Sequence, residues 1–354
     1  MSRRPAPTRA ARVRAAAFAN GEEYAVAQPA QTVDWSSLRY EDGEPIEFVA
    51  PLMTKMPELG YGVFRHGVVR GPAGTPVVPE DTLLIDAVNV NLNAAFRRYS
   101  RPAKLFDAVE LTGEVINLAS MFSVNNYGHA LLDGMGRLGL LQAAGYDFTR
   151  ASWVIMPGFA SVGFHQTMAL AGFSPESLIV PTKGAHYRCE QLVQTTFPGR
   201  PRAYSGAISR FFRSLDVPQA GRGRRLLVTR KGGKRTATND DQLDGLADEF
   251  GLEIYEARNS PFSPSDFAAA ELVVGAHGAG LSDIAFCAPG TNVIEILPSG
   301  HRYPYFATLA SASGLNYVAV RGKSVTDQPN ANFVADVPAL RRAIEAADRR
   351  RQTL

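Results

Sequence analysis

The chain has 354 residues, of which 45% are hydrophobic and 20% charged, and its 37 basic and 34 acidic side chains leave a net charge of +3. This composition is typical of a globular protein with two domains, and the small basic excess argues against nucleic-acid binding. Because two cysteines form no disulfide framework and no stretch approaches the roughly 20 apolar residues of a membrane span, we expect a cytoplasmic protein.

The first 35 residues are predicted to be a disordered basic tail. Five arginines precede the first acidic residue, Glu22, and the apolar run at 15–19 is shorter than the roughly 7–15 residues of a secretory signal core. An alternative is that these arginines, with those at 349–351, attract the chain to an anionic membrane surface, which would make it a peripheral membrane protein. Strands are expected at 62–69 and 82–88.

From residue 114 onwards, apolar runs alternate with helical patterns. Further strands are predicted at 115–118, 153–156, 178–181, 191–197, 225–229, 252–255, 272–274, 292–297 and 315–320. Helices are predicted at 128–144, 165–171, 208–215, 240–250, 264–270, 282–287, 305–313 and 337–350, with Asn239 and Gln242 as a capping box. This alternation favours an α/β fold with doubly wound parallel sheets.

A break in the pattern at 198–222 separates two predicted domains. We assign residues 36–205 to an N-terminal α/β domain and residues 206–330 to a C-terminal Rossmann-like domain. Residues 331–354 are assigned to a final helix.

The first candidate site opens the helix predicted at 128–144. His129 and Asp133 are four residues apart and therefore share one helical face, beside Asn126 and Tyr127. A carboxylate there can orient the imidazole and raise its basicity, as a general base requires. The alternative is a histidine that orders the start of the helix.

The second candidate is the basic loop Thr229-Arg230-Lys231-Gly232-Gly233-Lys234-Arg235, which is followed by Asn239. It comes directly after a predicted strand, at the end where parallel sheets bind ligands. Arginine forks match phosphate oxygens, so the loop is interpreted as a grip for a diphosphate; a solvated basic loop is the alternative. Asp240 and Asp241 are expected to serve a helix N-terminus rather than a metal.

The third candidate is the turn Gly275-Ala276-His277-Gly278-Ala279-Gly280-Leu281 with Ser282, which joins a predicted strand to a helix start. Glycines let the backbone approach a ligand closely, and helix N-termini offer free N–H groups to an anion. Glu295, an acid in the next apolar strand, needs a partner if it is buried, either a ribose diol or a core arginine. The six histidines show no metal-ligand spacing.

Four blocks in this order resemble glycosyltransferase family 61, which contains bacterial capsular polysaccharide proteins, plant xylan-decorating transferases and extracellular O-linked GlcNAc transferases. They are Asn126-Tyr127-Gly128-His129 with Asp133, then Arg230…Arg235…Asn239-Asp240-Asp241-Gln242-Leu243, then Gly275 to Leu281, then Pro289-Gly290-Thr291-Asn292-Val293-Ile294-Glu295. The similarity covers roughly residues 110–320.

The resemblance implies a GT-B arrangement, with two Rossmann-like domains facing across a cleft, and inverting transfer from a nucleotide sugar, usually a UDP sugar. By position, Arg230, Arg235 and the 277–282 turn would hold the diphosphate and Glu295 the ribose or base, while His129 or Asp133 would lie near the acceptor. The family commonly has Asn where this chain has Asp283; a carboxylate beside a phosphate is unfavourable, so Asp283 either points away or alters donor binding.

We therefore predict an inverting glycosyltransferase, with a saccharide or lipid-linked acceptor, that serves capsule or exopolysaccharide synthesis. It is expected to use the nucleotide sugar as co-substrate, without a cofactor or metal. The alternatives are a sugar-nucleotide epimerase or hydrolase and a non-catalytic nucleotide-sugar-binding module.

Overall fold

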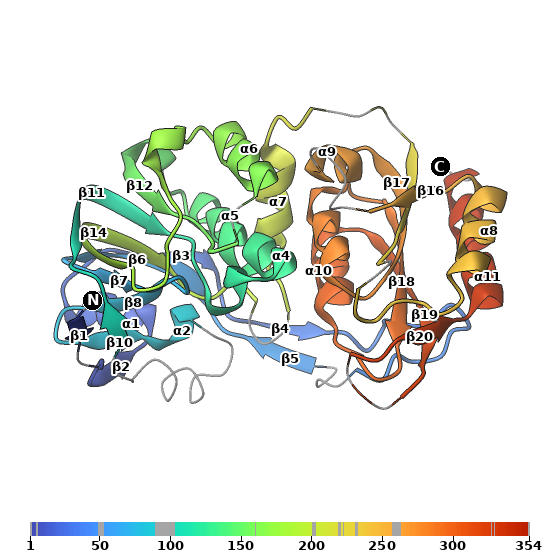
Figure 1. The fold of residues 1–354 in the computed structure, drawn as a ribbon, viewed down its shortest axis with the longest axis horizontal. Coiled ribbons are helices and arrows are strands. Elements are labelled where there is room, and N and C mark those ends of the chain that lie inside the picture. Colours follow the sequence, from blue (N-terminus) through green and yellow to red (C-terminus); the bar gives the residue numbers. More distant parts are fainter. Residues whose placement is uncertain are drawn as a thin grey trace. The chain divides into compact units, whose positions relative to one another are not determined.

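The computed structural model describes residues 2–4, 6–48, 53–88, 103–159, 161–199, 203–218, 221, 223–230, 233–256, 263–326, 328 and 330–352. The chain folds into two compact units (Figure 1). The first comprises residues 1–31, 55–201 and 210–215, and the second comprises residues 32–54, 202–209 and 216–354. Each unit combines helices with a sheet that contains parallel strands, which confirms the predicted α/β class.

The core of the first unit is a run of parallel strands. Its order is β13 (Leu178–Ile179), β12 (Ala151–Ile155), β11 (Val109–Asn117) and β14 (His186–Thr195). The chain moves outward from β11 to β12 and β13, and then returns to the other side of β11 as β14. The point where the strand order reverses therefore lies between β11 and β14.

Antiparallel strands extend this sheet beyond β14. They are β7 (Val68–Arg70), β8 (Thr75–Val78) and β9 (Thr82–Leu84), followed by β2 (Arg9–Ala11) parallel to β9, and a branch formed by β6 (Leu59–Arg65) and β3 (Tyr24–Gln28). Two small sheets pair β1 (Ser2–Arg4) with β10 (Ala103–Leu105), and β4 (Gln31–Asp34) with β5 (Met53–Met56).

Helices of the first unit connect these strands. They are α1 (Val13–Ala19), α2 (Ile85–Val88), α4 (Tyr127–His129), α5 (Gly136–Ala143) and α6 (Val162–Leu170), with short 3₁₀ turns at Met121–Val124, Phe148–Arg150 and Pro175–Ser177. The helix α7 (Gly206–Ser214) is divided between the units, with residues 206–209 in the second and 210–214 in the first. A π-helical turn, η2 (Ala130–Met135), joins α4 to α5. The predicted helix at 128–144 is thus interrupted at the position of Asp133.

The second unit contains a six-stranded sheet. Its order is β16 (Glu253–Tyr255), β15 (Arg224–Val228), β17 (Ala270–Ala276), β18 (Asn292–Pro298), β19 (Asn316–Ser324) and β20 (Phe333–Ala335). All pairs are parallel except β19 with β20. Because β15 and β16 lie on one side and β17 to β19 on the other, the strand order reverses between β15 and β17.

Both faces of this second sheet are covered. One face packs on α8 (Asp240–Phe250) and α11 (Val337–Gln352) through a core that includes Leu246, Leu340 and Ile294. Figure 1 shows α9 (Ser263–Ala268) and α10 (Tyr305–Ser313) on the opposite face, which also contains the 3₁₀ helix η6 (Ala279–Phe286). Because the helices cover the two faces, the segments at the carboxyl ends of the strands are loops.

Several expectations from the sequence are corrected here. Residues 1–35 are not a disordered tail, because Val13, Ala16 and Ala17 of α1 are buried in the core of the first unit. Residues 32–54 belong to the second unit rather than to the N-terminal domain. The segment 82–88 is a strand followed by a helix. No helix among the described residues is long and apolar enough to cross a membrane.

Two glycine substitutions test the packing of these helices. A Cβ atom at Gly134 in η2 would lie 2.6 Å from Cγ of Pro157 and 3.1 Å from the Leu118 carbonyl oxygen, whereas one at Gly245 in α8 would meet nothing within 4 Å. Gly134→Ala should lower the free energy of unfolding by about 1–3 kcal/mol. Gly245→Ala should raise it by about 0.5–1 kcal/mol, because alanine favours a helix. Urea titrations followed by tryptophan fluorescence measure both; a shift of the same sign would contradict the close contact at Gly134.

Candidate functional site

The predicted pair in the first unit is formed. Nδ1 of His129 lies 2.6 Å from Oδ2 of Asp133, whose side chain is only 3% exposed while that of His129 is 30% exposed. The side chain of Asn126 caps the helix by accepting a hydrogen bond from the His129 backbone N–H at 3.2 Å. The imidazole is therefore held at Nδ1 by a buried carboxylate, and part of the ring is exposed.

The charge of Asp133 controls the protonation of His129. Burial lowers the pKa of His129, but the hydrogen bond and the charge of Asp133 raise it by more, so the pKa lies above its ordinary value. Since an ionised carboxylate only accepts hydrogen bonds, the Nδ1 proton points to Asp133, and Nε2 of the neutral ring carries the lone pair. This is the arrangement that a general base requires.

Sequence reasoning missed a buried arginine behind this pair. Arg137 is 1% exposed, and it donates hydrogen bonds to the Asp133 carbonyl at 3.0 Å, to Thr195 Oγ1 at 3.0 Å and to the Ala87 carbonyl at 2.7 Å. Burial lowers its pKa to about 10, and it stays charged at neutral pH. Arg137 thereby ties the π-turn to the end of β14. The sequence offered one indication of this role, because Arg137 lies four residues after Asp133 and residues at this spacing share one helical face.

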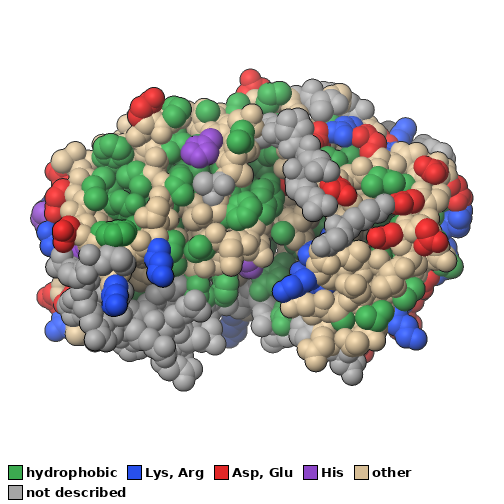
Figure 2. Space-filling model, viewed as in Figure 1, with side chains coloured by type: hydrophobic (Ala, Val, Ile, Leu, Met, Phe, Trp, Pro, Cys, Tyr) green, Lys and Arg blue, Asp and Glu red, His purple; other side chains and the backbone are tan. Residues whose placement is uncertain are grey.

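Aromatic side chains lie against His129 and the neighbouring Tyr127. The ring of Phe122 lies 5.1 Å from the His129 ring, and Tyr127 stacks on Phe164 at 5.3 Å. Phe122 is 40% exposed and Val162, at the start of α6, is 72% exposed. Figure 2 shows hydrophobic side chains gathered on this face of the first unit. Tyr127, predicted to contact an acceptor, thus contributes to the aromatic packing that supports the helix start.

In the second unit, Arg230 follows β15 and lies against the glycine turn after β17. Its Nη1 donates a hydrogen bond to the His277 carbonyl at 3.0 Å. A Cβ atom at Gly278 would stand only 1.3 Å from that same Nη1, so the guanidinium occupies the space that a side chain at 278 would take. The two segments predicted to hold one ligand therefore meet at the reversal of strand order.

Arg235 adds a second cation. Its Nη1 lies 2.9 Å from Nε2 of His301, which must accept because a guanidinium only donates. Burial, together with repulsion from Arg235, lowers the pKa of Arg230 to about 10, and burial also lowers the pKa of Arg235. Among the described residues neither arginine has a carboxylate partner, in contrast to Arg224, which pairs with Glu253 and Asp266.

Several polar atoms near these arginines are buried and have no hydrogen-bond partner within the described part of the chain. They are Nε of Arg235, Oγ of Ser282 and Oγ1 of Thr229. The first N–H groups of η6, at Ala279 and Gly280, also lack partners within their helix. An uncompensated cation pair with spare donors is the electrostatic requirement for binding an anion such as a diphosphate.

His277 is held by a buried acid. Its Nδ1 lies 2.5 Å from Oε1 of Glu295, and the Tyr317 hydroxyl donates to Oε2 at 2.6 Å. The sheet register explains this grouping, because Gly275 pairs with Glu295 and Glu295 pairs with Ala319. His277 and Tyr317, each two residues from those partners, lie on the same face as Glu295.

Comparisons with known proteins bear directly on these residues. Residues 127–294 match the family model described as "Glycosyltransferase 61". The match shows a similarity of this segment, called the family 61 region below, to that family. The matched region begins at Tyr127 and ends one residue before Glu295, so it contains the His129 pair, both arginines and the glycine turn.

Two curated relatives share short segments with the chain. A β-1,2-xylosyltransferase of rice (Oryza sativa subsp. japonica) is 43% identical over 51 residues, which is 14% of this chain and 10% of the rice protein. A β-1,2-xylosyltransferase of Arabidopsis thaliana is 36% identical over 62 residues, 18% of this chain and 12% of that protein. The similarity therefore spans about a tenth of the length of each relative.

The structure revises some of the residue roles expected from the sequence. Glu295 is fully buried with both oxygens bonded to protein, so it holds His277 instead of being presented to a ribose. The Asn239 amide binds both backbone groups of Ala335 and does not cap α8. The side chains of Leu281 and Asp283 are buried. Lys231 lies outside the described residues.

Other features around His277 were not foreseen from the sequence. Tyr317 and His301 complete the surroundings of His277, and finding them requires the sheet register and the path of a loop. Among the described residues, no group of three or more His, Cys, Asp or Glu side chains is arranged to hold a metal ion.

The anion site of the family 61 region is tested by removing each arginine. Arg230→Ala and Arg235→Ala should each weaken binding of UDP and inorganic pyrophosphate about tenfold to a hundredfold, because a hydrogen bond to a charged group contributes about 1.5–3 kcal/mol. Calorimetric titration measures the affinity. Arg341→Ala is the matched control, since Arg341 pairs with Glu249 on the surface of the same unit. Unchanged affinity in both site variants would remove the diphosphate role.

Proposed function

We propose that this chain is an inverting glycosyltransferase that moves a sugar from a UDP-linked donor to a hydroxyl group of a saccharide or lipid-linked acceptor. The observation that carries the proposal is the pair Arg230 and Arg235, two partly buried cations that have no carboxylate partner among the described residues and lie where the strand order reverses. The family 61 match over residues 127–294 supports the reaction class.

His129 is proposed to activate the acceptor. Its Nε2 takes the proton of an acceptor hydroxyl while Asp133 holds the ring and stabilises the imidazolium that forms. The acceptor oxygen then bonds to the anomeric carbon from the face opposite the nucleotide, and the bond from that carbon to the diphosphate oxygen breaks. A single displacement of this kind inverts the anomeric configuration.

The second unit is proposed to stabilise the leaving group. The departing UDP gains negative charge, which Arg230, Arg235 and the N–H groups at the start of η6 neutralise. Glu295 keeps His277 in place beside Arg230. Because the arginines supply the positive charge, the proposed reaction needs no metal ion.

The sequence resemblance implies a GT-B arrangement, and we keep it as part of the proposal. The general base of the first unit and the donor cations of the second would then face a common cleft.

The two relatives are named for xylosyl transfer, so UDP-xylose is the first donor to test. A capsule or exopolysaccharide setting, cytoplasmic location and peripheral association with a membrane stay predictions from the sequence.

Replacing His129 tests the proposed base. His129→Ala should reduce kcat for sugar transfer about 10²–10⁴-fold, the usual contribution of general base catalysis, and should leave UDP affinity unchanged. His165→Ala is the matched control, because His165 is an exposed histidine on α6 of the same unit. The rate of transfer from UDP-xylose is measured as the rate at which UDP is released. Near-normal transfer by His129→Ala would refute the assignment, and turnover without an acceptor would favour an epimerase or hydrolase.

The pH dependence tests the coupling of His129 to Asp133. A base must be neutral, so kcat should fall as the pH drops through the pKa of His129, which lies above its ordinary value of about 6.5. Asp133→Asn removes the charge that raises this pKa and leaves the burial that lowers it. The acidic limb of the pH–rate profile should therefore move to lower pH, together with a loss of kcat. An acidic limb at the same pH in both proteins would show that another group titrates.

A further inference from the structure

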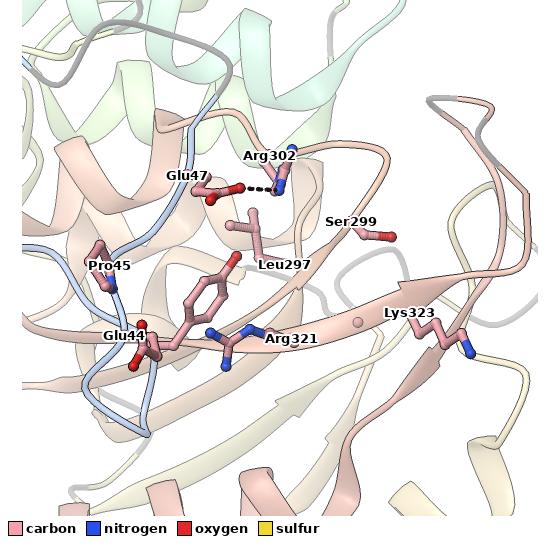
Figure 3. A pocket seen from close by; sticks show the side chains of 10 residues that line it. Glu44, Pro45, Glu47, Leu297, Ser299, Arg302, Arg321 and Lys323 are labelled. Carbon is pink, nitrogen blue, oxygen red and sulfur yellow. Dashed lines mark hydrogen bonds and ion pairs between the residues drawn. The ribbon is translucent and has the colours of Figure 1, made fainter.

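A pocket of about 550 Å³ lies wholly within the second unit, at the carboxyl ends of β18 and β19. Figure 3 shows it between the segment that carries Glu44 and Glu47 and the strand ends that carry Leu297 and Arg321. This volume is within the range of about 300–1,000 Å³ that is typical of small-molecule sites.

The outer wall of the pocket is anchored to the sheet. Glu47 pairs with Arg302 at 3.1 Å, Asp42 pairs with Arg321, and the Arg321 guanidinium lies over the Tyr40 ring. Beneath these pairs, Tyr40, Ile46, Leu297 and Ala319 form a small hydrophobic cluster. The wall is therefore packed firmly against the sheet of the second unit, although its residues lie more than 200 positions earlier in the sequence than the strands that it contacts.

The charges of this pocket cancel, unlike those around Arg230. Two of its cations, Arg302 and Arg321, are paired with Glu47 and Asp42. Glu44 and Lys323 have no ion-pair partner in the described ranges, and Figure 3 shows Lys323 apart from the Glu47–Arg302 pair. The lining has three cations and two carboxylates, and Asp42, which pairs with Arg321 from outside the lining, brings the balance to zero. The carboxylates Glu44 and Glu47 would repel a diphosphate.

The chemistry of the lining suits a polyhydroxylated ligand. A sugar hydroxyl both donates and accepts, so it can bond to carboxylates as well as to Arg302, Lys323 and Ser299. Pro45, which is exposed, offers apolar surface to the C–H groups of a sugar ring. Nε of Arg302 is buried without a hydrogen-bond partner and is a donor that such a ligand can use.

One loop connects this pocket to the anion site. Arg302 lines the pocket, while the preceding residue, His301, contacts the His277 ring at 4.8 Å between ring centres and bonds to Arg235. Occupation of the pocket would therefore act on the same loop that supports Arg235.

We propose that this pocket binds a neutral saccharide, as a recognition site for the acceptor chain that is separate from the diphosphate site. Its role in acceptor recognition rests on the proposed glycosyltransferase function, whereas saccharide binding itself does not. The proposal assigns Glu44 and Lys323, which have no ion-pair partner among the described residues, as the residues that hold the ligand.

Binding of neutral disaccharides tests this proposal. Xylobiose, mannobiose and cellobiose are titrated into the full chain at millimolar concentrations and followed by saturation-transfer NMR and calorimetry. At least one should bind, and Glu44→Gln and Lys323→Gln should each weaken that binding about tenfold, the loss expected for one charged hydrogen bond. UDP affinity should be the same in both variants and the wild type. Glu176→Gln and Lys183→Gln, exposed residues of the first unit, are matched controls.

The outcomes separate this proposal from the proposed function. If no disaccharide binds, if the variants bind as the wild type does, or if UDP displaces the sugar competitively, the saccharide pocket is refuted, while UDP binding still supports the donor site. If a disaccharide binds through Glu44 and Lys323 but UDP does not bind, the pocket stands and the glycosyltransferase proposal fails. Because Glu44 and Lys323 are exposed, neither substitution should disturb folding.

Discussion

A reversal of strand order determines where each unit can hold functional side chains. On either side of such a reversal, the connections that follow neighbouring parallel strands leave toward opposite faces of the sheet, so the strand ends between them stay uncovered. In the first unit this happens beside β11, the strand that precedes His129, and in the second between β15 and β17. Arg230 and His277 follow those two strands and meet there.

Electrostatic balance distinguishes the sites of the second unit. Most arginines at its surface have carboxylate partners, as Arg224, Arg341 and Arg342 do. Arg230 and Arg235 are instead partly buried without a carboxylate partner among the described residues, and the charge of Arg235 disfavours the charged form of Arg230. Sites that bind tightly to charged ligands often carry such unsatisfied charge. The pocket beside Glu44 differs from this site, because most of its charged side chains are in ion pairs.

The sequence predicted features that depend on local spacing. The i, i+4 relation of His129 and Asp133 identified a real contact, and apolar runs located the strands that precede Arg230 and His277. Features that depend on distant contacts were missed or misassigned. Glu295 was matched to a ribose because its partners, His277 and Tyr317, are found only through the register of three strands. The helix α1 buries mainly small alanines, which give little apolar periodicity.

The contact between Arg230 and Gly278 ties together two positions that are far apart in the chain. Any side chain at 278 would enter the volume of the guanidinium, and a shorter residue at 230 would leave a void beside the turn. A side chain at 278 would displace the guanidinium from this place and break its hydrogen bond to the His277 carbonyl. The residue at 278, which has no charge of its own, thereby determines where the positive charge of Arg230 lies.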